Sequence, residues 1–425
     1  MPIPLFDLSR QKKEQASLYE SMKRAALEVL EHQEFILGRE VEAFESEIVR
    51  RALQEPSSSS LNEEELSLVR KRAHAIGTSS GTDALLALLL AQDIGPGDAV
   101  ITTPYTFFAT AGCVHRVGAE LLFCDIDPTT YLMDPEKLQK LLASLSPDAE
   151  GGLRTARGNR VKMIIPIHLF GVCCHMDAIM SLAWQYELMV IEDAAQVLGA
   201  DYPSSDGPKK AGAIAPMSYF SFYPTKNLGA AGDAGLAVCQ DAQLAQRVRL
   251  IRNHGMEERY YHKVVGGNFR LDALQAAILR ARLPFLEKWN EKRRENAALY
   301  RAAFLQNGLL ERIALPAEPW VQSGLKNHHL YHQYVIRILE SAPSSSHAGL
   351  RERVIANFIK KKIGYAIYYP VPLHLQECFA YLGYMQGDFP HAESAAQETL
   401  ALPIFPELHP EEIQEVVATI AQAMD

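Results

Sequence analysis

Two stretches of the chain carry residues that could do chemistry. Lys226 lies in residues 218–227 (SYFSFYPTKN), in a polar loop between an apolar, aromatic strand and a glycine-rich turn. A lone lysine is normally solvated, but this setting favours a partly enclosed amine. Asp193 follows the apolar run 189–191, so it is expected at the mouth of a sheet. Taken alone, Asp193 could equally be the N-cap of a following helix.

A third stretch has the composition of a phosphate cradle. Residues 77–82 (GTSSGT) precede a strongly apolar helical pattern that starts near Asp83. Small residues at a helix N-terminus leave backbone N–H groups free, and the helix dipole adds to their attraction for phosphate. By itself this signal is weak, because Ser, Thr and Gly are also common helix caps.

Together the three stretches match the requirements of pyridoxal 5'-phosphate (PLP). This cofactor needs a lysine for its Schiff base, an acid at its pyridine nitrogen and a cradle for its phosphate. The acid keeps the ring protonated, so that the ring can absorb electrons when a Cα proton leaves. A lysine that carries this proton needs a lowered pKa, which desolvation and a cationic neighbour supply. We therefore predict a PLP enzyme with Lys226 as its catalytic residue.

The elements expected around these residues alternate between strands and helices. Helical periodicity covers 11–51, 82–92, 176–186 and 272–304, and 331–336 resembles a strand. Five other short apolar runs predict buried strands: 99–102, 120–124, 163–167, 189–191 and 236–239. This order predicts an α/β fold with a mostly parallel sheet sandwiched by helices, in which ligands lie beyond the carboxyl ends of the strands. We expect a large cofactor-binding domain with an N-terminal helix over 1–255, and a smaller C-terminal α/β domain over 256–425.

Composition excludes several classes of partner. The 425 residues carry a formal net charge of -9, which gives no basic footprint for nucleic acid or an anionic membrane. The longest apolar run, 84–91, is too short to span a bilayer. Residues 1–13 lack the order of a secretory signal, and the six cysteines lack metal-type spacing. We expect a cytoplasmic protein that binds neither nucleic acid nor membrane.

Other patterns suggest sites that we do not expect. His328 and His332 are four residues apart, but no carboxylate of the H-E-x-x-H type accompanies them, so no metal site is predicted. The glycines of 229–235 have the spacing G-x-x-G-x-x-G, which is not the dinucleotide motif. Residues 55–60 (EPSSSS) with the acidic 62–65, and the stretches 148–160 and 341–349, are expected to be exposed loops.

Six motifs in order resemble the DegT/DnrJ/StrS family of sugar aminotransferases. The resemblance runs from about Leu5 to Val417, and it implies the fold-type-I architecture of PLP-dependent transferases and a homodimer with shared active sites. The motifs are GTSSGTDAL (77–85), TPYTFFAT (103–110), IPIHLFG (165–171), EDAAQ (192–196), SFYPTKNLGAAGD (221–233) and GGNFRLDALQAAIL (266–279).

The resemblance assigns roles residue by residue. Lys226 would form the Schiff base and Asp193 would pair with the pyridine nitrogen, while Gln196 would approach the ring hydroxyl. Asn268 would reach the phosphate in the neighbouring subunit's site, which implies the dimer. The remaining cofactor contacts would be Gly81, Thr82 and Ser221 on the phosphate and Phe107 stacked on the ring.

Substrate contacts are expected from four further residues. Arg270 could hold a carboxylate with its guanidinium fork, or it could make a surface ion pair. The stretch 368–374 (YYPVPLH) resembles members that aminate the sugar at C-3, and we expect its Tyr369 and His374 at the substrate. A histidine at position 368 is typical of members acting on uronates, so Tyr368 argues against a uronate. His168 could be a site residue or a packed strand-end histidine.

The resemblance implies transfer of an amino group from glutamate to a nucleotide-activated keto sugar, expected to be a 3-keto sugar, for polysaccharide or glycoconjugate synthesis. Amination at C-4 stays open. So does a PLP-binding regulator or sensor without turnover, against which the intact catalytic set argues. Related sugar dehydratases have histidine in place of the lysine, so the presence of Lys226 disfavours dehydration.

Overall fold

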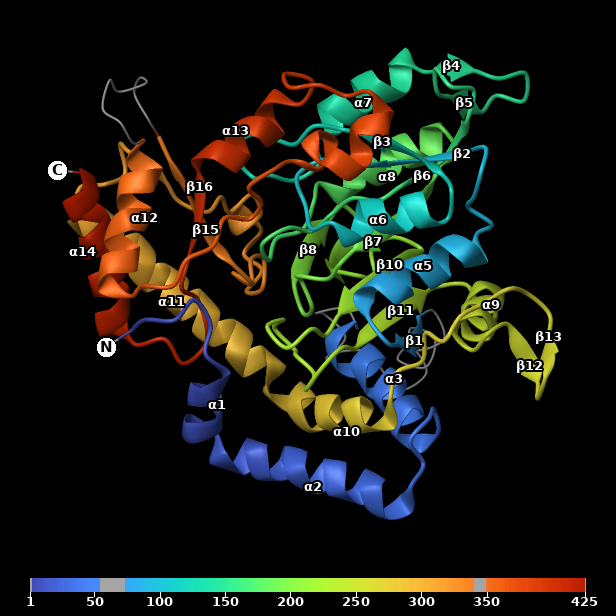
Figure 1. Ribbon diagram of the computed structural model, residues 1–425, viewed down its shortest axis with the longest axis horizontal. Coiled ribbons are helices and arrows are strands. Elements are labelled where there is room, and N and C mark those ends of the chain that lie inside the picture. The colour runs from blue at the N-terminus through green and yellow to red at the C-terminus, as the bar shows by residue number, and fades with distance from the viewer. Residues whose placement is uncertain (1, 54–72, 340–348, 425) are drawn as a thin grey trace.

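The computed structural model describes residues 2–53, 73–339 and 349–424 and has the expected α/β fold (Figure 1). The expected loops at 55–60, with the acidic 62–65, and at 341–348 lie outside the described residues. The third expected loop, 148–160, is only partly irregular. It lies between β4 (Ser146–Pro147) and β6 (Arg160–Ile164) and includes β5 (Leu153–Arg154), which pairs antiparallel with both strands.

The central sheet is mostly parallel, as predicted. Its other strands are β1 (His74–Thr78), β2 (Asp98–Thr102), β3 (Glu120–Phe123), β7 (Met189–Asp193), β10 (Met217–Ser221) and β11 (Gly235–Cys239). The order is β1-β11-β10-β7-β6-β2-β3, and only β11 runs antiparallel to its neighbours β1 and β10. Four of the five predicted strands are confirmed within two residues, and the fifth, predicted at 163–167, is β6, which ends at Ile164. Strand β1 was not predicted from the sequence. It is a short edge strand, and Gly77 interrupts its apolar residues.

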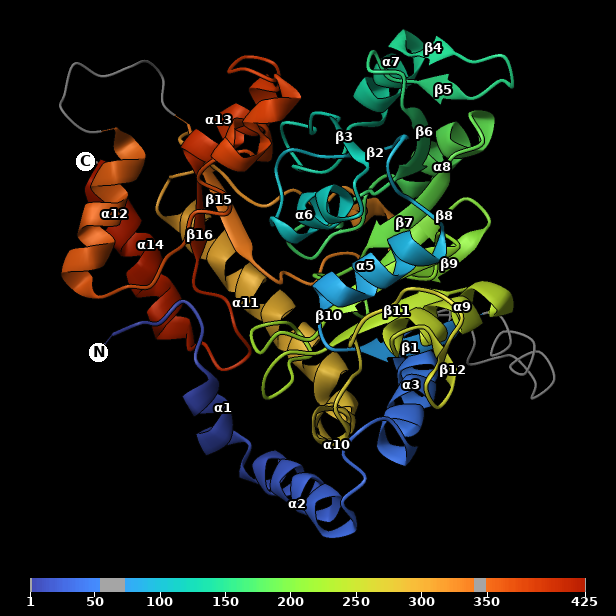
Figure 2. The same ribbon diagram turned by 45° about the vertical axis from the view of Figure 1, so that its right-hand side comes forward.

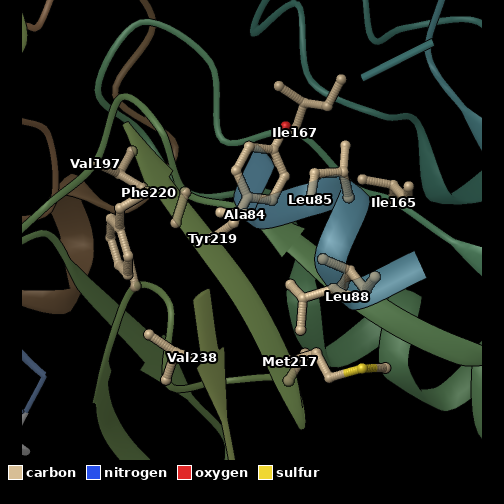
Figure 3. Packing of buried hydrophobic residues seen from close by; sticks show 14 of the residues in the cluster. Ala84, Leu85, Leu88, Ile165, Ile167, Val197, Met217, Tyr219, Phe220 and Val238 are labelled. Atoms are coloured by element: carbon tan, nitrogen blue, oxygen red, sulfur yellow. The ribbon is translucent and has the colours of Figure 1, made fainter. Parts of the chain in front are cut away.

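Helices pack closely on this sheet. They are α5 (Gly81–Ala91), α6 (Ala109–Arg116), α7 (Pro135–Ser144), α8 (Met176–Gln185) and α9 (Ala242–Arg252). Figure 3 shows Leu88 of α5 beside Met217 of β10, and Leu85 beside Ile165. Ser80 caps α5, because its hydroxyl accepts a hydrogen bond from the Asp83 N–H at 3.0 Å. The predicted helices at 82–92 and 176–186 are therefore confirmed.

The N-terminal region forms three helices instead of the single predicted one. These are α1 (Leu8–Glu14), α2 (Ala16–His32) and α3 (Arg39–Ala52). Helix α2 ends where Gln33 takes a left-handed conformation with φ 60°, and α3 begins after Gly38, with φ 77°. Periodicity alone does not detect such breaks, because the apolar positions continue in helical spacing on both sides.

The predicted helix at 272–304 is also interrupted. It consists of α10 (Ala273–Arg282), the 3-10 turn η2 (Leu283–Phe285) and α11 (Leu286–Gln306). Pro284 explains the break, because proline lacks the N–H that an α-helix interior requires. Helix α10 packs against α2 and α3, while α11 runs diagonally across to α14 (Pro410–Met424), as Figures 1 and 2 show.

A second hydrophobic core lies at the far end of α11. It includes Phe304, Ile336, Phe358 and Phe405, together with Ile3 from the start of the chain, which forms a parallel bridge with Ile363. The elements here are β14 (Ile313–Ala314), β15 (Tyr334–Ile338), α12 (Leu350–Lys361), β16 (Thr399–Leu402) and α14, and β15 is the strand expected at 331–336. A division at residue 255 remains a proposal, and it does not describe the packing of Ile3 or of α10.

The remaining described elements are short connections. They are β8 (Asp201–Ser204) paired with β9 (Gly207–Lys210), β12 (Met256–Glu258) paired with β13 (Tyr261–His262), η3 (Val321–Ser323), η4 (Leu373–Leu375), η5 (Glu377–Leu382) and α13 (Pro390–Glu398). Among the described residues, no helix combines the length and apolarity needed to cross a bilayer. The same residues contain no group of three or more His, Cys, Asp or Glu side chains that could hold a metal.

Gly235 provides a test of how the sheet supports α5. A Cβ at this position would lie 2.2 Å from the carbonyl of Ser80 and 2.5 Å from the nitrogen of Gly81. Gly235→Ala should therefore destabilise the fold by about 1–3 kcal/mol through overpacking, measured as a lower midpoint of thermal unfolding. In the control Gly95→Ala, the nearest atom to the new Cβ is the Val117 oxygen at 3.6 Å. Equal midpoints for the two variants would contradict this account.

Candidate active site

The carboxylate of Asp193 lies at the carboxyl end of β7, in register with Tyr219 of β10. Asp193 is buried, with 6% of its surface exposed. Its Oδ2 accepts hydrogen bonds from Thr110 Oγ1 at 2.9 Å and from the Tyr219 hydroxyl, and its Oδ1 accepts from the Ala195 N–H at 3.2 Å. Asp193 is thus a preorganised acceptor that could hold a ring N–H.

Lys226 lies near this carboxylate, in the loop after β10. Burial lowers the pKa of Lys226 to about 8, while the negative charge of Asp193 acts in the opposite direction. The loop is tight: the Lys226 N–H donates to the Tyr223 carbonyl at 2.8 Å, and a Cβ at Gly229 would lie 2.3 Å from the Pro224 oxygen. The backbone of Lys226 is therefore held in place, and its amine is partly neutral near neutral pH, as a nucleophile or a base must be.

The next residue of this loop ties it to the rest of the molecule. Asn227 donates through Nδ2 to Asn290 Oδ1 of α11 at 2.7 Å, and its Oδ1 lies 2.8 Å from Nδ1 of His332. Because Oδ1 is an acceptor, His332 must carry a proton on Nδ1. Burial, with Lys226 and Arg293 nearby, lowers the pKa of His332 well below its usual value, so the ring is neutral. His332 is therefore a buried, packed histidine that supports the loop of Lys226.

Gln196 follows Asp193 by three residues and is also buried. Its Oε1 accepts from the Phe170 N–H at 2.6 Å, and its Nε2 lies 3.5 Å from the Tyr369 hydroxyl. Tyr369 in turn contacts the Tyr105 ring edge-on, with centroids 5.9 Å apart. The structure therefore brings Gln196 and Tyr369 together. Nε2 has a second hydrogen that no protein group uses among the described residues.

The three residues expected at the phosphate gather around the N-terminus of α5. A Cβ built on Gly81 would lie 2.9 Å from Ser221 Cβ and 3.3 Å from the Phe220 oxygen, so only glycine allows this approach. Thr82 is in the first turn of the helix, where N–H groups have no partner within the helix. These residues fit a phosphate, because a small hydroxyl side chain and free N–H groups converge at the positive end of a helix dipole.

Phe107 lies beside this cradle and is 61% exposed. Together with Thr82, Phe108, Cys113 and Phe379 it lines a cavity of about 350 Å³. An exposed aromatic ring next to the phosphate cradle is available to cover a planar ligand.

The segment that contains Asn268 and Arg270 lies next to residues 78–79, at the start of the same cradle. The Phe269 carbonyl accepts from the Ser79 N–H at 3.0 Å, and Arg270 forms an isolated bridge with Thr78. Asn268 is exposed, whereas Arg270 is partly buried and donates through Nη1 to Asn253 Oδ1 at 2.9 Å. Within the described residues Arg270 has no carboxylate partner, and its Nε makes no hydrogen bond. The surface ion pair left open above is therefore not formed within this part of the chain.

Two expected substrate residues do not reach the site. His168 is wholly buried: its Nδ1 accepts from the Cys174 N–H at 3.1 Å, so its Nε2 carries the proton that points at Glu192 Oε2, 2.9 Å away. His374 is 1% exposed, with Nε2 3.1 Å from Glu393 Oε1 and its ring against Phe389. Both are packed histidines with almost no exposed surface in this structure, which for His168 is the packed alternative given above.

Sequence reasoning missed the residues that support Asp193. Thr110 ends the motif 103–110, and Tyr219 lies in the stretch 218–227 around Lys226, but no role was assigned to either. A signal was present for Tyr219, because alternation along a strand places it on the same face as Ser221. Glu192 was likewise missed. It is wholly buried and accepts main-chain N–H bonds from Gly212, Ile214 and Ala215 at 2.6–2.8 Å.

The fold and the site together define an aminotransferase of fold type I, a class that depends on PLP. The chain belongs to the DegT/DnrJ/EryC1/StrS aminotransferase family, whose model matches residues 17–421. The resemblance stated from the motifs is thereby confirmed.

Three similar proteins illustrate the range of this family. The chain is 39% identical to a pleiotropic regulatory protein of Geobacillus stearothermophilus, over 99% of this chain and 98% of that protein. It is 37% identical to a UDP-N-acetyl-3-dehydro-alpha-D-glucosamine 3-aminotransferase of Acidithiobacillus ferrooxidans, again over 99% and 98%. The crystal structure of S. venezuelae DesV in complex with a ketimine intermediate matches with a TM-score of 0.82 and 31% identity, over 99% and 98%.

The lowered pKa of Lys226 makes a prediction about its reactivity. With a pKa of about 8, roughly one amine in ten is neutral at pH 7, against about one in several thousand for an ordinary lysine. Acetylation of cofactor-free protein at a series of pH values, followed by mass spectrometry, should give a midpoint near pH 8 for Lys226. Exposed Lys23, whose pKa is raised by its hydrogen bond to Glu20, is the internal control.

The same experiment tests the influence of Asp193. Its charge favours the protonated amine, so Asp193→Asn should move the Lys226 midpoint to a lower pH. A midpoint for Lys226 that coincides with that of Lys23 would contradict the enclosed site.

Proposed function

We propose that this enzyme transfers an amino group from glutamate to a nucleotide-activated 3-keto sugar, with Lys226 as its catalytic residue. The observation that carries the proposal is the enclosed Lys226 amine, with its pKa of about 8, close to the buried carboxylate of Asp193. The sugar and its position of amination are supported by relatives such as the 3-aminotransferase of Acidithiobacillus ferrooxidans. The product would enter polysaccharide or glycoconjugate synthesis.

The residues of the site have separable tasks in this proposal. PLP supplies an aldehyde that captures amines and a ring that absorbs electrons. Gly81, Thr82 and Ser221 would hold its phosphate, Phe107 would cover its ring and Gln196 would contact its hydroxyl. Asp193 would accept from the ring nitrogen, and Lys226 would move a proton to and from the substrate carbon. Tyr369, beside Gln196, would line the substrate space.

Two further proposals concern the setting of the enzyme. Two copies would form a homodimer in which Asn268 contacts the phosphate in its partner's site, and the exposure of Asn268 is compatible with such a contact. The protein would work in the cytoplasm, and its six cysteines, all free, are compatible with a reducing compartment.

A regulatory role without turnover is the second candidate, favoured by the name of the Geobacillus relative. The enclosed amine and the preorganised carboxylate argue against it, since a protein that only binds PLP has no need for a proton carrier. Amination at C-4 in place of C-3 would leave this site unchanged and differ only in the sugar that it accepts.

Replacing the lysine tests the mechanism. Lys226→Ala should reduce exchange of the amino group between glutamate and 2-oxoglutarate by at least about a thousandfold, because it removes both the anchor and the proton carrier. The measurement is the visible absorption of the bound cofactor before and after glutamate, together with release of 2-oxoglutarate. Lys23→Ala, at an exposed position, is the control. Unchanged exchange in Lys226→Ala would refute the mechanism, and normal cofactor binding without exchange in the unsubstituted protein would favour the regulator.

Arg270 gives a separate test of donor binding. If its guanidinium holds the glutamate carboxylate, Arg270→Gln should raise the KM for glutamate by roughly tenfold or more, since a charged hydrogen bond is lost. The cofactor spectrum without glutamate should not change. Arg24→Gln, at an exposed position, serves as the control, and a KM for glutamate that stays the same in both variants would remove Arg270 from the proposed site.

A further inference from the structure

The hydrogen bonds to Asp193 leave one acceptor position open. Each carboxylate oxygen has two lone pairs. Among the described residues, Oδ2 accepts from two hydroxyls, those of Thr110 and Tyr219, and Oδ1 accepts from one donor, the Ala195 N–H. These residues therefore occupy three of the four positions, and the one that they leave open is on Oδ1. A single N–H of a ligand is the complement that this arrangement can take.

Tyr219 is built into the sheet behind this carboxylate. It is 3% exposed, and its strand β10 is in parallel register with β7, so that Tyr219 lies directly beside Asp193. Figure 3 shows its side chain on the opposite side of β10 from Phe220, close to Ala84 of α5. Burial, together with the neighbouring charge of Asp193, raises the pKa of Tyr219 well above its usual value. The hydroxyl consequently keeps its proton and stays a donor.

The two hydroxyls act on one oxygen from different elements. Thr110 is on α6 and Tyr219 is on β10, and their oxygens lie 3.1 Å apart. The terminal torsion of an aspartate is soft, so one donor on Oδ2 beside the Ala195 N–H on Oδ1 would leave the carboxylate some freedom to rotate. Donors from two directions remove this freedom, and charge-assisted hydrogen bonds also stabilise the anion.

We propose that Tyr219 is a positioning residue that, through Asp193, holds the free Oδ1 lone pair toward the ring nitrogen of PLP. This inference rests on the proposed function, in which Asp193 is the partner of that nitrogen. Tyr219 itself touches no reacting atom.

The experiment compares two cofactors on the same variants. Tyr219→Phe removes only the hydroxyl, and affinity is measured for PLP and for its analogue with carbon in place of the ring nitrogen. We expect PLP to bind about tenfold more weakly to the variant, while the affinity of the analogue changes by less than about twofold. Tyr300→Phe is the matched control: Tyr300 is wholly buried in the second core, and its hydroxyl donates to the Pro403 carbonyl at 2.8 Å. It should change neither affinity.

A second measurement uses the Asp193→Asn background, in which Tyr219→Phe should have no further effect on PLP affinity, because the charge through which it acts is absent. Equal losses for PLP and the analogue in Tyr219→Phe would show a merely structural role and overturn the inference. Because the comparison uses two ligands on one variant, a general loss of stability cancels.

Failure of the proposed function is recognised separately. If the unsubstituted protein binds the analogue as tightly as PLP, then Asp193 has no role at the ring nitrogen, and both proposals fall. If the unsubstituted protein prefers PLP but Tyr219→Phe keeps the same preference, only the role of Tyr219 falls.

Discussion

The site depends on keeping an amine and a carboxylate close together where water is scarce. Burial of Lys226 lowers its pKa to about 8, and the charge of Asp193 limits that fall. A buried carboxylate is costly unless protein donors replace its lost water. The fold supplies them from three directions: the main chain at Ala195, α6 through Thr110, and β10 through Tyr219. This arrangement depends on the register of β7 and β10. Strand β7 carries Asp193, whereas β10 carries Tyr219 and leads into the loop of Lys226.

The two neighbouring acids of β7 show how a strand can separate structural and ligand-directed roles. Glu192 and Asp193 are adjacent and both buried, but side chains alternate across a strand. Glu192 accepts from three main-chain N–H groups and from His168, so its capacity is spent inside the fold. Asp193 keeps one position unused. The same residue chemistry thus stabilises the loop 212–215 on one side of the sheet and awaits a ligand on the other.

The parts of this structure that the sequence predicted were those with a strong local signal. The apolar strands, the helix over 82–92 and the family motifs were found because each depends on residues close together in the chain. The breaks in the helical regions were harder. Gln33 takes a left-handed conformation without being a glycine, and Pro284 lies in a stretch otherwise dense in helix-forming residues.

The support of the site was also hard to predict, for a different reason. Whether a histidine contacts a ligand or packs inside depends on tertiary neighbours. In the sequence, His168 and His374 cannot be told apart from histidines that contact a ligand. In the structure, their ring nitrogens form hydrogen bonds with Glu192 and Cys174 and with Glu393, respectively. Tyr219 finds its partner only through the pairing of two strands that are more than twenty residues apart in the chain.

Asn227 has a consequence for how the molecule can move. This side chain binds α11 through Asn290 and the segment before β15 through His332, while its backbone neighbour is Lys226. The loop that carries the lysine is thus joined by short polar contacts to α11 and to the segment before β15. A shift of these elements relative to the central sheet would therefore displace the backbone of Lys226. The placement of the reactive nitrogen is in this sense a property of the whole chain, and substitutions far from the sheet edge, in the packing of α11, can retune it.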